Sequence, residues 1–433
     1  MPVSLGRAAL SSLHITNAWH PTSGGVRTFY QALIEQGNQD GRRVTVVVPA
    51  ERSSTEPVGA FGRSHFVAAP AAPGFDRRYR LLYPHTYLPP LGGPLHRILA
   101  SERPDVVEIC DKYTLPYLAA VVRKGLLRGV RRPALVGLTA ERFDDNMDAY
   151  LSQRAGARRF TRWYIRHIYG PPFDAHLANS EYTAAELRAA LPDRPDGFIR
   201  VCPPGVGTED FSPGRRSPAR RAMVLDAMGA PGTATLLLYA GRLSPEKNVE
   251  LLVDTLRHLV ASGNDVRLAV AGEGPRADWL RAQATGTLAQ RIHLCGNLDR
   301  PSLAELYASC DVFVHPNHRE PFGIAPLEAM ASGVPVVVPD AGGVRTYADA
   351  TNAWLAAPEA EAFASAILRA ALGDDARLAA AMATTRQFRW ETAARRHFVH
   401  YDAIHAQTFG NASGLPAAEF PSPSARPVPA TDP

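Results

Sequence analysis

Short apolar runs alternate with segments of helical periodicity along the first 200 residues. Segments with an amphipathic spacing of 3.6 residues lie between the runs, at 26–36, 116–127 and 181–190. The runs have the length and the β-branched content of buried strands, and they lie at 12–17, 42–49, 104–109, 134–139, 175–178 and 199–202. This strand–helix alternation predicts a parallel, doubly wound α/β sheet.

The same alternation starts again near Thr235, so the chain contains a second α/β unit. Its expected strands lie at 236–240, 266–271, 292–295, 312–315 and 334–338. Its expected helices lie at 249–262, 277–284, 302–309, 325–332, 359–372 and 375–386. Between the two units, the segment 203–207 and the Pro/Arg-rich stretch 212–221 are interpreted as a linker.

A chain of 433 residues is too long for one ordinary hydrophobic core. We therefore expect an N-terminal domain over 1–205 and a C-terminal domain over 206–390. A helix over 391–408 is expected to cross back to the N-terminal domain. The Pro/Ala/Ser-rich tail 409–433 has the composition of a disordered segment.

Composition narrows the classes of function. The net charge of +5 and pI near 9.1 suit anionic small molecules or a membrane surface, but no motif indicates a nucleic-acid binder. The four cysteines show no paired spacing, so neither a zinc site nor a disulfide framework is indicated, and no metal site is predicted. No signal peptide or membrane-spanning apolar run is visible, so the expected location is cytoplasmic.

Two carboxylates, Glu320 and Glu328, flank a Pro-Phe-Gly turn that leads into a predicted helix. The backbone amides of Phe322, Gly323 and Ile324 fall at the start of that helix. Such amides bind phosphate or sugar oxygens, and a nearby acid accepts hydroxyl protons. The alternative interpretation is that the acids only complement the helix dipole.

Arg242 and Lys247 lie in the loop after the strand 236–240, where an open parallel sheet binds its ligands. Two fixed cations suit a diphosphate leaving group. A solvated loop with scattered charge is the alternative, but lysine occurs only three times in this arginine-rich chain. The pair Gly24-Gly25, at another helix start, indicates either a ligand approach or a tight turn made for packing.

Three segments together carry a family resemblance: GRLSPEKNVELLVDTL, AGEGP and EPFGIAPLEAMASGVPVVVPDAGGV. They resemble the nucleotide-sugar half of retaining glycosyltransferases of family four, which have the GT-B fold. The resemblance continues through ANSEYTAAEL and PPGVGTEDFSP to SGGVRTFYQAL and covers most of residues 10–408. It implies two Rossmann-like domains that face each other across a cleft, with the N-terminal domain on the acceptor side and the C-terminal domain binding the nucleotide sugar.

The resemblance also implies roles for individual residues. Arg242 and Lys247 would hold the diphosphate, while Glu320 would hold the donor sugar. The amides of Phe322, Gly323 and Ile324 would also contact the donor sugar, and Glu328 would accept hydrogen bonds from the ribose hydroxyls. The loops at Gly272, Gly274 and Leu298 would border the base. Gly24 and Gly25 would face the diphosphate.

The implied reaction is the transfer of a hexosyl group, of mannose or glucose type, from a nucleotide diphosphate sugar with retention at the anomeric carbon. No metal and no cofactor beyond the donor is expected, and the acceptor is a lipid, a glycan or a small molecule. Alternatives are a GT-B-like nucleotide-sugar epimerase, a phosphorylase, for which this lysine-poor chain offers few candidate lysines, and a catalytically silent sugar-nucleotide-binding protein.

One position departs from the family pattern. After the strand 134–139, relatives often place a histidine against the donor sugar, in some members as His-Glu-Arg. This chain has Ala140 there, followed by Glu141 and Arg142. A shifted alignment, a natural difference and a deliberate substitution each account for it. Loss of the histidine would slow transfer and leave nucleotide binding largely intact. A catalytically silent sugar-nucleotide-binding protein is therefore retained as an alternative.

The stretch Arg154–Tyr169 interleaves arginines with aromatic side chains. That composition is typical of an interfacial helix attracted to anionic lipid, which would deliver a lipid acceptor. The alternative is a surface helix on which arginine stems cover apolar neighbours.

Overall fold

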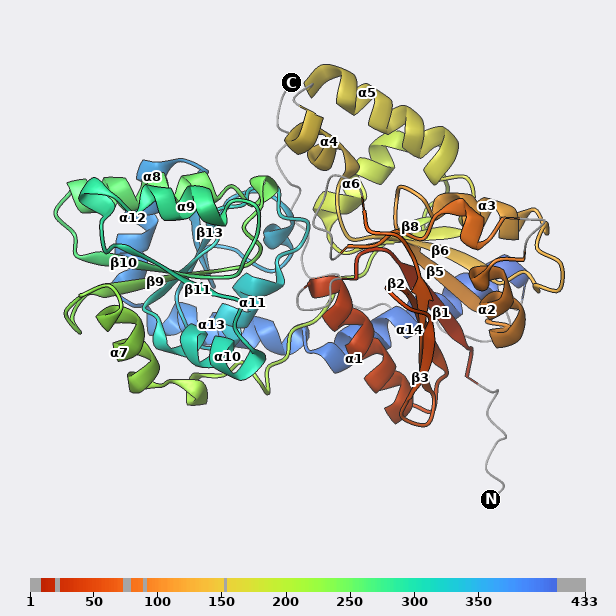
Figure 1. Ribbon diagram of the computed structural model, residues 1–433, viewed down its shortest axis with the longest axis horizontal. Helices are drawn as coiled ribbons and strands as arrows, with labels where there is room; N and C mark the ends of the chain where they lie inside the picture. The colour runs from red at the N-terminus through yellow and green to blue at the C-terminus, as the bar shows by residue number, and fades with distance from the viewer. Residues whose placement is uncertain (1–8, 20–23, 73–78, 89–91, 152–153, 411–433) are drawn as a thin grey trace. The chain divides into compact units, whose positions relative to one another are not determined.

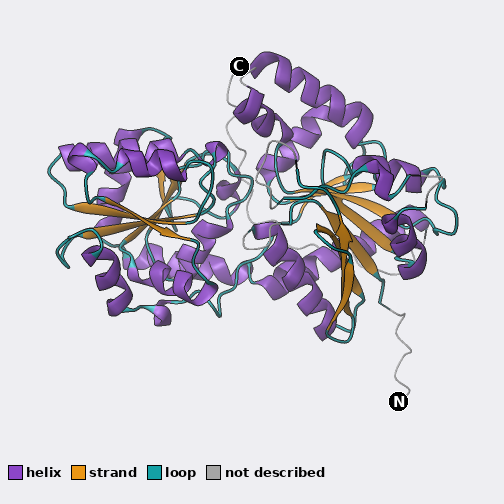
Figure 2. Cartoon of the chain, viewed as in Figure 1, coloured by secondary structure: helices purple, strands orange, loops and turns teal. Residues whose placement is uncertain are grey.

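The computed structural model describes residues 9–19, 24–72, 79–88, 92–151 and 154–410, which form two compact units. Unit 1 contains the described residues before Gly205, apart from Ala149–Leu151, together with the helix that begins at Trp390. Unit 2 contains Gly205–Arg389. Each unit is a sheet covered by helices on both faces (Figures 1 and 2). The predicted disordered tail beyond Gly410 lies outside the described residues.

The sheet of unit 1 has eight strands in the order β3-β4-β2-β1-β5-β6-β7-β8. All neighbours are parallel except β3, which pairs antiparallel with β4 at the edge. The strands are β1 Ser12–Thr16, β2 Val44–Ala50, β3 Ser54–Val58, β4 Gly62–Ala68, β5 Val106–Cys110, β6 Ala134–Thr139, β7 Ala175–Ala178 and β8 Ile199–Val201. Strands β1, β2, β5 and β6 are buried along almost their whole length, because a helix layer covers each face of the sheet. Strands β2 and β6 are mainly apolar, whereas β1 and β5 carry the buried His14 and Glu108.

The helices of unit 1 include one from the far end of the chain. They are α1 Gly25–Gln39, α2 Pro94–Glu102, α3 Pro116–Arg123, α4 Phe143–Leu151, α5 Arg154–Tyr164, α6 Glu181–Ala190 and α14 Trp390–Phe409. A single π-helical turn, Ile165–Tyr169, follows α5, so the predicted interfacial segment is two elements. Helix α6 is capped by Ser180, which forms a capping box with Thr183.

A buried glutamate ties α14 into unit 1. Glu108 on β5 is fully buried and accepts hydrogen bonds from Tyr401 of α14 at 2.6 Å and from Tyr30 of α1 at 3.0 Å. His14 on β1 lies 3.1 Å from the same carboxylate. Burial alone would raise the pKa of Glu108, but its contact with His14 outweighs this and lowers that pKa. The last helix is therefore held by polar contacts as well as by apolar packing.

The sheet of unit 2 has six parallel strands in the order β11-β10-β9-β12-β13-β14. Its strands are β9 Thr235–Ala240, β10 Val266–Ala271, β11 Ile292–Gly296, β12 Val312–Val314, β13 Val336–Pro339 and β14 Trp354–Ala356. Its helices are α7 Pro218–Asp226, α8 Val249–Ala261, α9 Ala277–Gln283, α10 Arg300–Ser309, α11 Ile324–Ala331, α12 Ala360–Ala371 and α13 Asp375–Gln387.

The linker predicted at 212–221 is wrong. Helix α7 begins at Pro218, and the Ser217 side chain accepts a hydrogen bond from the Arg220 amide at the N-terminus of the helix. Proline is favoured in the first turn of a helix, where no intrahelical N–H bond is lost. Val224 and Leu225 of α7 are buried in the core of unit 2, so this segment is part of the unit.

Candidate functional site

The loops at the carboxyl ends of the strands in unit 2 touch backbone to backbone. Gly272, after β10, has a φ of 140°, and a Cβ there would lie 2.0 Å from the carbonyl oxygen of Gly241, after β9. Gly343, after β13, would place a Cβ 1.9 Å from the carbonyl oxygen of Pro321, after β12. Only glycine permits these approaches. The loops that carry most of the predicted donor residues therefore form one layer.

Glu320 lies buried in this layer, with basic and amide groups around it. Lys247 Nζ donates to its two carboxylate oxygens at 2.8 and 3.1 Å, and Asn317 Nδ2 donates at 3.0 Å. His315 Nε2 lies 3.2 Å from the same carboxylate. Burial alone would raise the pKa of Glu320, but the charge of Lys247 and the contact with His315 outweigh it, so that pKa is well below its usual range. Sequence reasoning missed His315 and Asn317.

Arg242 lies in the same loop as Lys247 but closer to solvent. Its Nη2 donates to Glu246 at 3.0 Å, and its backbone carbonyl accepts from the Tyr239 hydroxyl at 3.0 Å. The Ser244 hydroxyl also donates to Glu246, at 2.5 Å. The loop therefore presents one cation over Glu320 and a second, half-exposed one beside it. This is an arrangement that can bind two neighbouring phosphate groups.

The start of α11 contributes backbone rather than side chains. The Phe322 ring is buried against Tyr347 and Phe388, at ring distances of 5.2 and 6.0 Å. Gly323 has a φ of 85°, and its carbonyl accepts the Tyr347 hydroxyl at 2.5 Å. No side chain caps α11, which begins at Ile324. The predicted roles of Phe322, Gly323 and Ile324 therefore depend on their amides.

Glu328 follows one turn later on α11 and is partly buried. The Tyr307 hydroxyl donates to it at 3.0 Å. Burial raises the pKa of Glu328 to about 7, against an opposing effect of the Arg300 charge. Its environment therefore favours the protonated form, in contrast to that of Glu320.

The residues predicted to border the base lie in the neighbouring loops of the same layer. A Cβ at Gly274 would lie 2.3 Å from the Leu243 carbonyl oxygen, so this glycine also packs on the loop after β9. The Gly272 amide donates to Gly296 at 2.8 Å, which joins the ends of β10 and β11. Leu298, two residues further, is partly buried against the core. Unit 2 therefore brings all its predicted donor residues to one edge of its sheet.

The other predicted residues belong to unit 1. Gly24 precedes α1 with a φ of 122°, and α1 begins at Gly25, as the glycine pair predicts; both glycines are exposed. Part of their loop, 20–23, lies outside the described residues. Ala140 follows β6 and is partly buried, and its carbonyl accepts from Asn179 Nδ2 at 3.2 Å.

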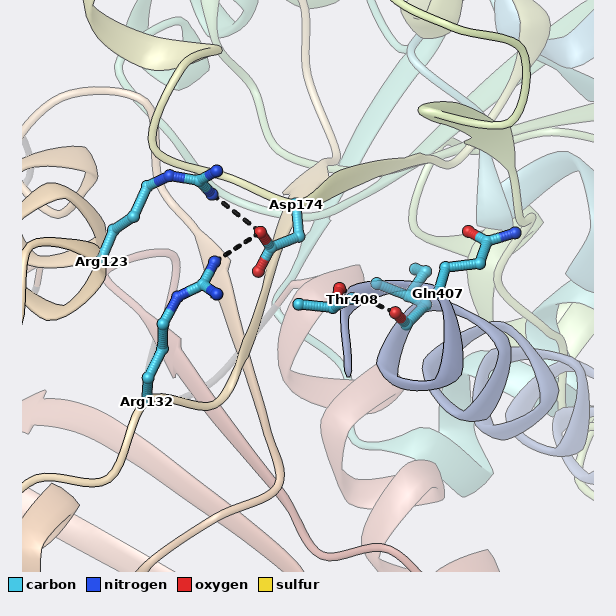
Figure 3. A pocket seen from close by; sticks show the side chains of 6 residues that line it. Arg123, Arg132, Asp174, Gln407 and Thr408 are labelled. Carbon is cyan, nitrogen blue, oxygen red and sulfur yellow. Dashed lines mark hydrogen bonds and ion pairs between the residues drawn. The ribbon is translucent and has the colours of Figure 1, made fainter. Parts of the chain in front are cut away.

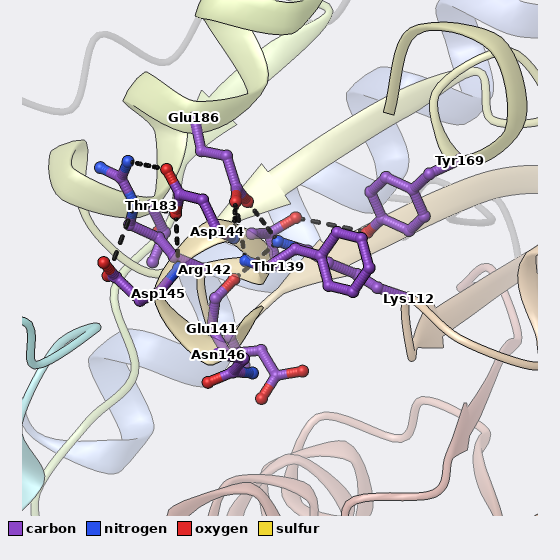
Figure 4. Close-up of polar contacts among 12 residues, drawn as sticks. Lys112, Thr139, Glu141, Arg142, Asp144, Asp145, Asn146, Tyr169, Thr183 and Glu186 are labelled. Atoms are coloured by element: carbon purple, nitrogen blue, oxygen red, sulfur yellow. Dashed lines mark hydrogen bonds and ion pairs between the residues drawn. The ribbon is translucent and has the colours of Figure 1, made fainter. Parts of the chain in front are cut away.

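A buried ion pair beside Ala140 was not predicted. Lys112, after β5, donates to Glu186 of α6 at 2.6 Å, and both side chains are almost fully buried (Figure 4). The scarcity of lysine in the sequence was a usable signal, because Lys112 is one of only three lysines.

Ala140 and Lys112 lie at the carboxyl ends of the unit 1 strands. A hollow of about 290 Å³ lies at the other edge of the same sheet, at the amino-terminal ends of the strands (Figure 3). There Asp174 accepts from Arg123 and Arg132 at 2.7 Å each and from the Leu135 amide at 2.9 Å. The last turns of α14 close the hollow with Gln407 and Thr408. Its guanidinium groups already share a carboxylate, so we interpret the hollow as part of the contact between α14 and the sheet.

Among the described residues, no group of three or more His, Cys, Asp or Glu side chains is arranged to hold a metal ion. None of the described helices is both long enough and apolar enough to span a bilayer.

Comparison with known proteins identifies the family. Residues 226–387 match the model of Glycosyl transferases group 1, and residues 23–210 match that of Glycosyltransferase Family 4. The chain is 30% identical over 357 residues to a GDP-mannose-dependent alpha-(1-6)-phosphatidylinositol dimannoside mannosyltransferase of Mycobacterium tuberculosis, covering 82% of this chain and 86% of that protein. The chain belongs to glycosyltransferase family four. A GDP-mannose-dependent alpha-mannosyltransferase of Corynebacterium glutamicum is 28% identical over 76% of this glycosyltransferase and 72% of its own length.

Solved structures agree on the fold. A sucrose-phosphate synthase from Thermosynechococcus elongatus matches with a TM-score of 0.67 and 19% identity, over 92% of this chain and all of its own. An Anabaena HepE structure in complex with UDP and glucose matches with a TM-score of 0.64 and 18% identity, over 91% of this chain and all of its own. The glycosyltransferase therefore has the GT-B fold, as the sequence predicts.

We predict that Glu328 makes stability fall as pH rises. Its pKa rises from 4.5 to about 7 on folding, so the folded state favours the protonated form. The resulting stabilisation is fully present below about pH 4.5 and is lost as pH rises through 7, on the order of 2–3 kcal/mol in all. Glu328→Gln keeps an acceptor for Tyr307 and removes the titration. Urea unfolding at pH 5 and pH 8 should show a smaller difference for this variant, and parallel profiles would contradict the assignment.

Proposed function

We propose that this glycosyltransferase transfers a hexosyl group from a nucleotide diphosphate sugar to an acceptor, with retention at the anomeric carbon and without a metal. The coarser activity, transfer of a glycosyl group from a nucleotide sugar, follows from the family. The finer proposal rests on one observation. Arg242 and Lys247 lie in one loop, and Lys247 meets Glu320 beside the start of α11. Fixed cations and helix amides stabilise a diphosphate as it leaves.

The ionised, ion-paired state of Glu320 supports a retaining route. A carboxylate whose pKa is held well below its usual range is a weak general base. Deprotonation of the acceptor then falls to the leaving phosphate oxygen, on the same face of the sugar as the attack. Glu320 keeps the roles of positioning Lys247 and accepting sugar hydroxyls.

The proposed donor is GDP-mannose, with UDP-glucose as the first competitor. Relatives from M. tuberculosis and C. glutamicum are named as GDP-mannose-dependent mannosyltransferases, and the Anabaena structure contains UDP and glucose. Hydrogen bonds from a pair of ribose hydroxyls would favour the ionised form of Glu328, whose pKa burial raises.

Removal of the Lys247 charge tests the donor site. Lys247→Met alone would leave Glu320 as an uncompensated buried charge, so the double variant K247M/E320Q is preferred. We expect its affinity for GDP-mannose to fall about 10- to 100-fold, the range for losing one charge-assisted contact. Thermal shift across a panel of nucleotide sugars measures this. Arg257→Ala, in an exposed ion pair on α8, is the control that should bind as wild type. Unchanged affinity in K247M/E320Q would refute the donor site.

Ala140 favours a second candidate function, a sugar-nucleotide-binding protein that does not catalyse transfer. The family resemblance implies a histidine at this position in many members. We predict that Ala140→His alters nucleotide release from the donor by more than it alters donor affinity, because most of the proposed nucleotide contacts lie in unit 2. Equal rates of release for both forms would contradict this role. A wild-type protein that binds the donor without releasing nucleotide would favour the silent binder.

We also propose that unit 1 attaches peripherally to the inner face of an anionic membrane through α5. Phe160 and Trp163 are 46% and 51% exposed, and their rings stack 6.1 Å apart. Arg158, Arg159 and Arg162 on the same helix are also exposed. Exposed aromatic rings beside arginines suit the interface of an anionic bilayer, which would deliver a lipid-linked acceptor.

Vesicle co-sedimentation tests the membrane proposal. We expect binding to vesicles that contain phosphatidylglycerol, weakened by salt, and little binding to phosphatidylcholine alone. The variant R158Q/R159Q/R162Q should lose about 1 kcal/mol of binding per arginine. Leu126→Ser, at an exposed apolar site outside α5, should bind as wild type. Binding that is absent, or equal for both lipids, would remove the proposal.

A further inference from the structure

The buried Glu320 carboxylate has two basic neighbours of different kinds. Lys247, from the loop after β9, donates to both of its oxygens, at 2.8 and 3.1 Å. His315, directly after β12, places Nε2 3.2 Å from the same carboxylate, and this residue is only 3% exposed. A lysine ammonium group keeps its charge near neutral pH, whereas an imidazole can gain or lose one there. Glu320 therefore lies between a fixed cation and a group whose charge can change.

The imidazole of His315 can accept a proton without breaking an existing hydrogen bond. Neither of its ring nitrogens makes an aligned hydrogen bond within the described part of the chain. Most buried polar groups are hydrogen-bonded, so two unmatched ring nitrogens beside a carboxylate require an explanation. A proton added to this ring gains the attraction of the Glu320 charge, which acts at short range in a buried place.

The charges around the donor loops cancel before a ligand binds. Lys247 pairs with Glu320, and Arg242 pairs with Glu246 at 3.0 Å. In a nucleotide diphosphate sugar, each of the two phosphate groups adds a negative charge. As the diphosphate attracts Lys247, the buried carboxylate loses part of its compensation, which is costly. The site is therefore short of positive charge once the donor is bound.

The other titratable groups around the carboxylate are less suited to take up a proton. His318 lies in the same loop, but burial and the charge of the arginine that follows it lower the pKa of His318. Burial and the charge of Glu320 raise the pKa of Tyr239 and that of Tyr347, so both phenols are already protonated. His315 instead faces a carboxylate, and a negative charge favours a cation beside it.

We propose that binding of the nucleotide-sugar donor draws one proton from solvent onto His315, which then compensates Glu320 while Lys247 binds the diphosphate. The proposal rests on the donor site proposed above and adds to it a positioning residue that acts through Glu320. No bond of the donor changes in this step, because the proton comes from the buffer and returns to it when the nucleotide leaves. Lys247 can thus serve the leaving group without leaving a buried carboxylate uncompensated.

Calorimetry counts the protons taken up on binding, when the titration is repeated in two buffers that differ in ionisation enthalpy. GDP-mannose is titrated into the full chain at pH 7.5. Its diphosphate is esterified at both ends, so it lacks the second ionisation near pH 6 of a phosphate monoester. His315→Gln keeps an N–H group near the position of Nε2 but cannot be protonated. We expect the wild type to take up about 0.5 to 1 proton more than this variant.

The same coupling predicts a pH dependence of affinity. Binding that takes up a proton weakens as pH rises, so the affinity of the wild type relative to that of H315Q should fall by up to about tenfold between pH 7 and pH 8. Glu328 gives an opposing signal, because ribose hydroxyls favour its ionised form and release a proton. Glu328→Gln removes that signal, and the comparison of wild type with H315Q cancels it. His258→Gln, at an exposed histidine of α8, is the matched control and should behave as wild type.

The outcomes separate the role of His315 from the donor site itself. Greater proton uptake by the wild type and H258Q than by H315Q supports the proposal. Equal uptake by the wild type and H315Q would overturn it and would place the proton on another group. Donor binding by E328Q without any proton uptake would also overturn it, whether or not H315Q folds. A wild-type protein that binds no nucleotide sugar would refute the donor site, and the role of His315 with it.

Discussion

The ion pair between Lys247 and Glu320 is the contact on which the arrangement of unit 2 depends most directly. It joins the loop after β9 to the loop after β12, and at 2.8 Å it leaves neither charge uncompensated in a buried place. Glycines at 272 and 343 let the adjoining loops close around it without side-chain clashes. Because removing one partner of a buried pair costs several kcal/mol, the loops and the pair keep each other in place.

Much of the fold could be predicted because the strands of both sheets have helix layers on both faces. Buried parallel strands are mainly apolar, and the segments at 134–139, 175–178 and 266–271 have the same bounds in the structure as in the prediction. The exposed edge strand β3, Ser54–Val58, gave no apolar signal and was not predicted. The Pro/Arg-rich composition before α7 concealed a helix start, since proline favours both loops and the first helical turn.

The candidate site also contains residues that the sequence predicts and residues that it does not. Glu320, Lys247 and the glycines were predictable, because loops after the strands of a parallel sheet are ordered along the chain and their chemistry is visible as residue types. His315 and Asn317 were not, because their role follows from the direction of side chains around a buried carboxylate. Glu186 lies on the inner side of α6, where a glutamate in a helical sequence gives no sign of the Lys112 that pairs with it.

The two units use carboxylates for opposite purposes, and this difference constrains the chemistry. In unit 1, Asp111 and Glu186 accept from backbone amides and so fix the shape of two loops. In unit 2, Glu320 accepts from Lys247, so the cation proposed to meet the leaving diphosphate is already held by a charge of opposite sign. A bound diphosphate must then share Lys247 with Glu320. Such sharing suits a leaving group whose negative charge grows as its bond to the sugar breaks, because the attraction of Lys247 for the phosphate increases with that charge.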